Sequence, residues 1–327
     1  MTPHFALRQM ACRHGSVGWR EAGQGPALVL LHGIGSGAMA WAGQLEAFAH
    51  SHRVIAWDAP GYGESAPLRQ AQPMAVDYAD ALDDFLRRLG VADLVLVGHS
   101  LGALVAAAWA GRWSRQALDM DAVARRVLMS IAAERSSDPG AMLPLALDAL
   151  VLASPARGYG QASAEVQASK WHERVALIQR LGVERMALER STALCAPGAS
   201  AAVVEQVRWS MARVTPGGYA QAAHMLAHDD IASHLQRLAP LVFPVMSPAM
   251  APAMTALVLP PTALAVATSV LCGALDAVTP PQACAQLARE HGASYTALPG
   301  VAHACYVEDP AGFNAALREC LSAKVSA

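Results

Sequence analysis

The sequence has 327 residues, 54% of them hydrophobic and 15% charged, which excludes a largely disordered chain because a sizeable apolar core can form. A formal net charge of −2 gives no basic excess of the kind that favours nucleic acid or an anionic membrane as a partner. The six cysteines include no CxxC pair, so we expect reduced thiols rather than a disulfide framework. The first residues contain no apolar stretch typical of a secretory signal, and we expect a cytoplasmic protein.

The stretch from Leu238 to Leu275 has no charged residue, which is a feature of membrane-spanning helices. Six prolines interrupt it, whereas a spanning helix needs roughly 20 apolar residues without such breaks. We therefore expect no membrane partner. Residues 238–265 are predicted to form a Pro-, Met- and Ala-rich loop that leads into a buried strand, and the role of this loop stays open.

Short apolar runs alternate with helical patterns over the first 131 residues. The predicted strands are Ala27–Leu31, Arg53–Trp57, Asp93–Val97 and Arg126–Ile131. The predicted helices between them span about 38–49, 76–89 and 101–113. Alternation of this kind predicts an α/β fold in which helices cover a parallel sheet.

The pattern changes between 134 and 238, where helical segments dominate. These segments are 143–152, 164–181, 201–214 and 218–226. Strand character returns at 266–272 and 294–298, and helices are predicted near 281–291 and 310–321. We therefore predict a core domain formed by residues 1–133 and 239–327, with residues 134–238 inserted into it as a helical domain.

The candidate nucleophile is Ser100, in the sequence Gly98-His99-Ser100-Leu101-Gly102. This sequence lies directly between the predicted strand Asp93–Val97 and an almost wholly apolar helix. Glycines two positions on either side of a serine allow the strand and the helix to approach closely around a strained turn. Such a turn presents the serine Oγ at the carboxyl edge of the sheet, where ligands bind in α/β folds. The N-terminus of the helix supplies N–H groups for a developing negative charge.

The candidate general base is His303. A serine hydroxyl needs a base that takes its proton, and a third group should orient that base. In hydrolases with a strand–turn–helix serine, the acid and then the histidine follow the serine along the chain. Only His291 and His303 lie beyond residue 240. His291 falls at the end of a predicted helix, whereas His303 lies in the loop after the last predicted strand.

The candidate orienting acid is Asp276, the only carboxylate between Arg237 and Glu290. It follows the predicted strand 266–272 in a region without other charges. A lone aspartate before a proline turn could instead cap a helix. The competing acid is Glu134, which follows the predicted strand Arg126–Ile131.

With these residues identified, nearly the whole chain outside the helical insertion resembles the α/β-hydrolase superfamily. His32-Gly33-Ile34-Gly35 resembles the oxyanion-loop motif of this superfamily, and residues 58–65 resemble its D-x-P-G-x-G-x-S turn. The resemblance implies an eight-stranded, mostly parallel sheet flanked by helices, with the insertion as a cap over the active site. Dehalogenases and epoxide hydrolases of the superfamily use aspartate as the nucleophile, and the serine here argues against both.

The same resemblance implies an oxyanion hole formed by the backbone N–H groups of Ile34 and Leu101. The residues expected to support the surrounding loops are His32, Gly33, Gly98, His99 and Gly102. No cofactor is expected, because the glycine-rich segment 33–37 has neither a P-loop lysine nor the Rossmann spacing. No metal is expected either, because the twelve histidines show no ligand spacing such as H-E-x-x-H.

The leading hypothesis is hydrolysis of a small-molecule carboxylic ester or lactone through an acyl-Ser100 intermediate. The alternative enzyme is a carbon–carbon bond hydrolase of aromatic ring-cleavage products that uses the same three residues. The alternative from another class is a catalytically silent ligand-binding protein, although silent members generally lack one of the three. Residues 214–222 are similar to a stretch in 3-oxoadipate enol-lactonases, but His32-Gly33 and the long segment before Asp276 depart from those enzymes.

Carbon–carbon hydrolases of this kind usually need cationic or polar groups for a substrate carboxylate. The candidates in the insertion are Arg157, Lys170, Arg174, Arg185, Arg190 and Arg208. Charged helices are more often simply solvated, so these residues alone do not identify the substrate. The expected partner is a small molecule, and the chain is expected to be a monomer or a homodimer.

Overall fold

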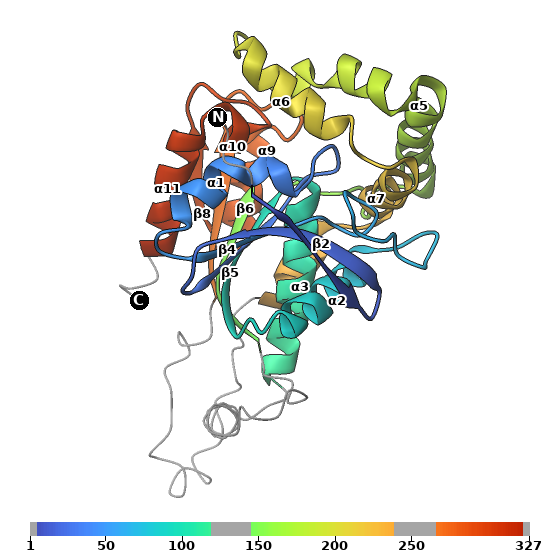
Figure 1. Cartoon of the computed structure of the whole chain (residues 1–327). Coiled ribbons are helices and arrows are strands. Elements are labelled where there is room, and N and C mark those ends of the chain that lie inside the picture. The colour runs from blue at the N-terminus through green and yellow to red at the C-terminus, as the bar shows by residue number, and fades with distance from the viewer. Residues whose placement is uncertain (1–4, 119–144, 239–265, 323–327) are drawn as a thin grey trace, which may run out of the picture.

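The computed structural model of the chain describes residues 5–118, 145–238 and 266–322, and its centre is an eight-stranded sheet (Figure 1). The strand order is β1-β2-β4-β3-β5-β6-β7-β8. The strands are β1 (Leu7–Cys12), β2 (Gly15–Ala22), β3 (Ala27–Leu31), β4 (Arg53–Trp57), β5 (Asp93–His99), β6 (Ala146–Ala153), β7 (Ala267–Gly273) and β8 (Ser294–Leu298). From β4 to β8 in this order, every neighbouring pair of strands is parallel. Strand β1 pairs antiparallel with β2, and β2 pairs antiparallel with β4. The predicted α/β fold with a mostly parallel eight-stranded sheet is confirmed.

Each face of the sheet has its own apolar core, as the alternation within β3 shows. Leu28 and Leu30 pack in one core with α1 (Ala42–Phe48) and α11 (Pro310–Ser322). Val29 and Leu31 pack in the other core with α2 (Ala75–Arg88), α3 (Leu101–Leu118) and α9 (Pro281–Glu290). Figure 1 shows α1 and α11 to the left of the sheet and α2 and α3 to its right. A strand between two helix layers must be apolar throughout, because successive side chains point to opposite faces.

The helical segment, defined here as residues 154–238, lies between β6 and β7 in the chain. Its elements are α5 (Ala164–Arg190), η2 (Thr192–Leu194), α6 (Ala201–Met211), α7 (Pro216–His228), α8 (Ile231–Leu235) and η3 (Gln236–Leu238). Four of its helices begin where a polar side chain accepts a hydrogen bond from the N–H three residues later, which is the usual N-cap arrangement. These caps are Ser163, Ser200, Thr215 and Asp230. In Figure 1, α5 and α6 lie above the sheet, and α8 packs against α3.

Strand β6 corrects the prediction of a helix at 143–152. Ala146–Ala153 pairs in parallel with β5 on one side and with β7 on the other. The strand is buried along most of its length, and an apolar run buried on both faces has no alternation that distinguishes it from a buried helix. The core therefore includes β6, and the predicted start of the insertion at residue 134 is too early.

The other predicted elements within the described residues agree closely with the observed ones. Strands β1 and β2 were not predicted from the residue pattern, because β1 is a mostly exposed edge strand with little apolar alternation. The predicted strand Arg126–Ile131, the competing acid Glu134 and residues 239–265 of the proline-rich loop lie outside the described residues.

The sequence also predicts no membrane span and no disulfide framework. No helix in the described ranges combines the length and the apolar character that crossing a membrane requires. All six cysteines are free thiols, as predicted.

Candidate active site

Ser100 occupies the tight turn that joins β5 to α3. Its φ of 52° lies in the left-handed region, which a residue with a side chain rarely adopts. The Ser100 N–H donates to the carbonyl oxygen of Ala153 at the end of β6 (2.9 Å), and the Ser100 carbonyl accepts from the Ala103 N–H at 3.1 Å. The strained turn is thus held from both sides by backbone hydrogen bonds, as the sequence motif predicts.

The flanking glycines are required by close packing of the backbone. A Cβ at Gly98 would collide with the carbonyl of Gly102, and a Cβ at Gly102 would collide with the carbonyls of Leu31 and His32. A Cβ at Gly33 would lie 3.0 Å from His99 Nδ1, which leaves little space there too. These glycines let the turn approach the end of β3.

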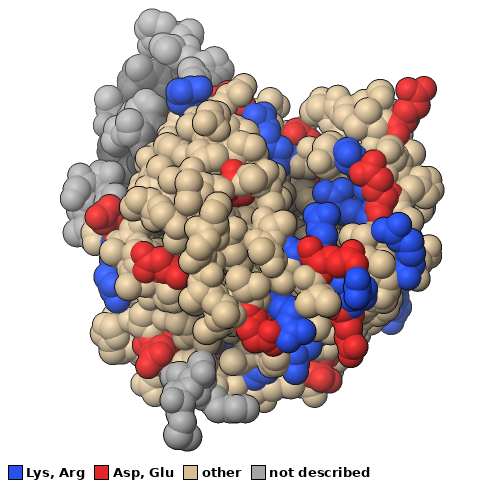
Figure 2. Space-filling view, turned by 90° about the horizontal axis from the view of Figure 1, so that it is seen from above, with Lys and Arg blue, Asp and Glu red and all other residues tan. Residues whose placement is uncertain are grey.

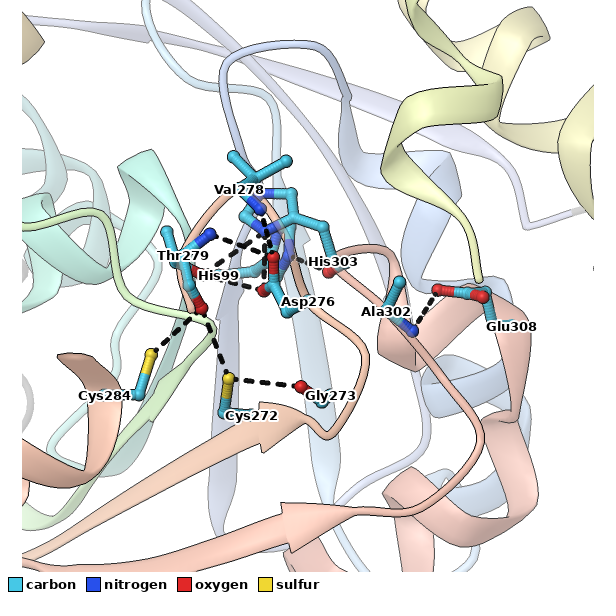
Figure 3. A network of polar contacts seen from close by, with 10 residues as sticks. All are labelled: His99, Cys272, Gly273, Asp276, Val278, Thr279, Cys284, Ala302, His303 and Glu308. Carbon is cyan, nitrogen blue, oxygen red and sulfur yellow. Dashed lines mark hydrogen bonds and ion pairs between the residues drawn. The ribbon is translucent and has the colours of Figure 1, made fainter. Parts of the chain in front are cut away.

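His303 and Asp276 lie on two neighbouring loops at the carboxyl ends of β8 and β7. The two strands pair in parallel with Gly273 beside Leu298, so the loops start side by side. Backbone hydrogen bonds from Ala274 to Leu298 (2.8 Å) and from Leu275 to Val301 (2.9 Å) continue this contact. His303 Nδ1 lies 2.9 Å from Asp276 Oδ2, and both side chains are buried (Figure 3).

The Asp276 carboxylate accepts three further hydrogen bonds. The N–H groups of Val278 and Thr279 donate to Oδ1 at 2.8 and 2.9 Å, and the Thr279 hydroxyl donates to Oδ2 at 2.7 Å. Burial by itself raises the pKa of Asp276, but the hydrogen bonds from His303 and Thr279 outweigh burial and hold the pKa well below its usual value. Asp276 is therefore ionised and can only accept hydrogen bonds. His303 Nδ1 must then carry the donated proton, which leaves Nε2 as the nitrogen that can take a proton.

Thr279 was not singled out from the sequence. Its position three residues after Asp276, before a pair of prolines, is the available signal, because an aspartate often accepts hydrogen bonds from residues two and three positions later.

Ser100 and His303 line one cavity of about 330 Å³, so the structure brings the predicted nucleophile and base to the same space. The cavity also contains Ile34 of the loop after β3, and its other wall comes largely from the helical segment, including Met186, Met211 and Tyr219. Seen from above, this face of the molecule is hollowed beside a group of Lys and Arg side chains (Figure 2).

Ile34 and Leu101 are the two residues whose backbone N–H groups are expected to form an oxyanion hole. Leu101 is the first residue of α3, where an N–H has no partner within the helix. The Ile34 loop is held by a hydrogen bond from the Tyr62 hydroxyl to the Ile34 carbonyl (2.9 Å). In the described part of the chain, no carbonyl accepts from either N–H. Of the two residues, Ile34 lines the cavity.

The side chains of His32 and His99 form hydrogen bonds with the backbone of the loops around Ser100. His32 Nε2 accepts from the Ala59 N–H at 3.0 Å, and its Nδ1 lies 2.8 Å from the Gly33 carbonyl. His99 Nε2 donates to the carbonyl of His303 at 2.8 Å. Burial lowers the pKa of His99 to about 3, and the neighbouring His303 adds to this, so His99 is neutral at ordinary pH.

Glu308, which the sequence did not indicate, joins the His303 loop to the helical segment. Its carboxylate accepts from the Ala302 N–H at 2.9 Å and from the Ala196 N–H at 2.6 Å (Figure 3 shows the first contact). His291, the rejected alternative base, lies at the C-terminus of α9 and does not line the cavity.

Comparison with known proteins decides the family. A family model described as alpha/beta hydrolase fold matches residues 26–318. The chain belongs to this family. The family establishes the fold, and the reaction of this chain is a separate question.

Matches to individual members of the alpha/beta hydrolase family are partial in sequence and extensive in structure. Over 85 residues the chain is 39% identical to (E)-2-((N-methylformamido)methylene)succinate hydrolase of Acinetobacter baylyi, a stretch that covers 26% of this chain and 32% of that enzyme. A solved thermophilic esterase from Thermogutta terrifontis has a TM-score of 0.70 at 23% identity, with 98% of this chain and 99% of that chain covered. An enol-lactonase from Burkholderia xenovorans has a TM-score of 0.68 at 18% identity, covering 96% of this chain and 100% of its own. At these identities the structural likeness shows the fold alone.

Proposed function

We propose that the protein is a serine hydrolase that cleaves a small-molecule carboxylic ester or lactone through an acyl-Ser100 intermediate. The observation that carries the proposal is the 2.9 Å hydrogen bond from His303 Nδ1 to the ionised Asp276, on a histidine that shares a cavity with a strained serine. This hydrogen bond leaves Nε2 of His303 as the base on the side of the substrate.

In the proposed reaction, Ser100 Oγ attacks the carbonyl carbon while its proton passes to His303 Nε2. The carbonyl oxygen becomes an oxyanion that the N–H groups of Ile34 and Leu101 stabilise, each by about 3–4 kcal/mol in the transition state. The bond to the leaving oxygen then breaks, and this oxygen takes the proton from His303. Water, deprotonated by His303, attacks the acyl carbon of the acyl-Ser100 ester. The bond between this carbon and Ser100 Oγ then breaks, Oγ takes the proton back from His303, and the acid is released.

The helical segment is proposed to act as a cap that sets substrate choice. This proposal is supported by the side chains that α5, α6 and α7 contribute to the cavity that contains Ser100. A cavity of about 330 Å³ suits a small-molecule ligand and lies at the lower end of the usual range for such pockets.

A carbon–carbon bond hydrolase of ring-cleavage products is the second candidate. Arginine side chains in the cavity wall favour this second candidate, because ring-cleavage products carry a carboxylate. The A. baylyi relative, by its name, hydrolyses a substituted methylene succinate, which also carries carboxylates.

The proposal is tested by intact-mass spectrometry after treatment with a fluorophosphonate. We expect one covalent adduct on the wild type and none on Ser100→Ala, because the reagent needs an activated serine. If the wild type forms no adduct, the proposal fails and a ligand-binding protein becomes the better description. A panel of short-chain esters, lactones and ring-cleavage dienones then separates the two enzyme candidates.

A further inference from the structure

The cavity that contains Ser100 has an unbalanced charge. Three arginines line it, Arg157, Arg174 and Arg190, and the described residues that line it include no aspartate or glutamate. Figure 2 shows Lys and Arg side chains intermixed with Asp and Glu on the right of the upper face, where Figure 1 places α5, so the excess of positive charge belongs to the cavity lining and not to the whole face. A cavity lined by charge of one sign attracts a ligand of the opposite sign.

Of the three arginines that line the cavity, two have no carboxylate partner within the described residues. Lys170, Arg185 and Arg208 form ion pairs with Glu173, Glu189 and Glu205, at 3.1, 2.9 and 2.6 Å respectively. Arg157 pairs with Glu290 at 3.1 Å. Within the ranges that the structure describes, neither Arg174 nor Arg190 forms an ion pair, so both charges can act on a ligand.

A bend in α5 brings Arg174 and Arg190 to one cavity. On a straight helix two residues 16 positions apart would be separated by about 24 Å along the axis. Gly182 lies between them and has non-helical angles, with φ 69° and ψ 169°, so that α5 consists of two pieces at an angle (Figure 1). Only glycine adopts such angles without strain.

Tyr219 lies with the two arginines in the cavity wall and supplies a hydroxyl donor. Burial raises the pKa of Tyr219, and the positive charges of Arg174 and Arg190 lower it in part. Arg174 is held in place because its Nη1 donates to the Lys170 carbonyl at 3.1 Å and its guanidinium lies 5.7 Å from the centre of the Tyr159 ring. Among the described residues, no further hydrogen-bond acceptor contacts its guanidinium.

We propose that Arg174, Arg190 and the Tyr219 hydroxyl bind a carboxylate of the substrate, so that the protein selects esters or lactones derived from dicarboxylic acids. This inference rests on the proposed hydrolase function for the bond that is cleaved, but the carboxylate subsite itself does not. A guanidinium presents two parallel N–H donors to the two oxygens of a carboxylate, and the phenol hydroxyl adds a third donor. The largely apolar remainder of the cavity accommodates the carbon chain.

The test measures binding without catalysis, by isothermal titration calorimetry on full-length Ser100→Ala. The two probes are monomethyl glutarate and dimethyl glutarate, which differ only in a carboxylate and its methyl ester. We expect the monoester to bind at least about tenfold more tightly, a difference of about 1.4 kcal/mol. Adding Arg174→Gln should remove most of this preference, and Arg190→Gln should reduce it by a smaller factor because Arg190 is exposed.

Arg185→Gln is the matched control, because Arg185 lies on α5 but pairs with Glu189 and does not line the cavity. It should leave the preference for the monoester unchanged. Equal affinities of the two probes overturn the inference, as does a preference that survives Arg174→Gln together with Arg190→Gln, or a monoester that fails to bind at millimolar concentration. A preference for the monoester in a protein without a fluorophosphonate adduct would support the subsite and contradict the hydrolase. A fluorophosphonate adduct together with no preference for the monoester would support a hydrolase of neutral substrates.

Discussion

His99 Nε2 donates a hydrogen bond to the backbone carbonyl of His303, 204 positions away in the sequence, at 2.8 Å. The residue immediately before the proposed nucleophile therefore holds the loop that carries the proposed base. Because burial lowers the pKa of His99 to about 3, this donor stays neutral and does not titrate in the range where the base works.

We predict that His99→Ala lowers kcat on the order of 10²-fold with a smaller change in KM, because the His303 loop loses its support and a displaced base is costly. His99→Gln should retain more activity, since its amide nitrogen can reach the same carbonyl. Steady-state kinetics on a short-chain ester, with circular dichroism as a check of folding, measures this. Equal rates in the two variants would show that the hydrogen bond does not position the base.

Replacing Asp276 by Asn should lower kcat by roughly 10⁴-fold, because an amide can stabilise the wrong tautomer of His303 and cannot stabilise its protonated form. His303→Ala and Ser100→Ala should each remove most turnover, and the three losses should not add. The measurement is kcat for the three single variants and one double variant. Wild-type rates in Asp276→Asn would mean that another acid orients His303.

Asp276 should also make stability depend on pH. An aspartate in the unfolded chain has a pKa of about 3.9, and Asp276 in the folded protein lies well below its usual value. The stabilisation is therefore complete above about pH 4 and is lost as the pH falls towards the lower folded pKa.

Urea unfolding of wild type and Asp276→Asn at pH 7 and pH 3 measures this effect. The difference between their free energies of unfolding should be smaller at pH 3. A difference that grows on acidification would contradict the assignment.

Gly98→Ala should destabilise the fold by several kcal/mol, because its Cβ would collide with the backbone of Gly102 and neither chain segment can move without disturbing the turn at Ser100. Gly217→Ala is the matched control, since a Cβ there meets nothing within 4 Å. Midpoints of chemical unfolding compare the two. A stable Gly98→Ala would show that the turn can relax.

Gly182→Ala should change ligand preference more than it changes stability. The residue's φ of 69° strains an alanine, while the space around its Cβ is open, so the two halves of α5 are expected to reorient. The preference for monomethyl glutarate over dimethyl glutarate should then fall. Gly198→Ala, with φ 88° and equally open space but outside α5, should carry a similar strain and leave this preference intact.

The candidate site was largely predictable because its signals are local. The serine turn needs a strand, two glycines and a helix within a few residues, and Asp276 and His303 each follow one of the last two predicted strands. Strand β6 was not predictable in this way. Its run is buried on both faces, and its identity as a strand depends on pairing with β5 and β7.

The sequence by itself determined most core elements other than β1, β2 and β6, the turn at Ser100 and the residues that could serve as base and acid, because these depend on periodicity and on neighbouring residues. Only the tertiary structure decided that Asp276 hydrogen-bonds His303, that His99 hydrogen-bonds the loop of His303, and that β6 lies between β5 and β7 in the sheet. It also decided which arginines face the cavity. Six basic residues of the helical segment were equal candidates in the sequence, and long-range packing and the bend at Gly182 separate Arg174 and Arg190 from those whose charges are already paired.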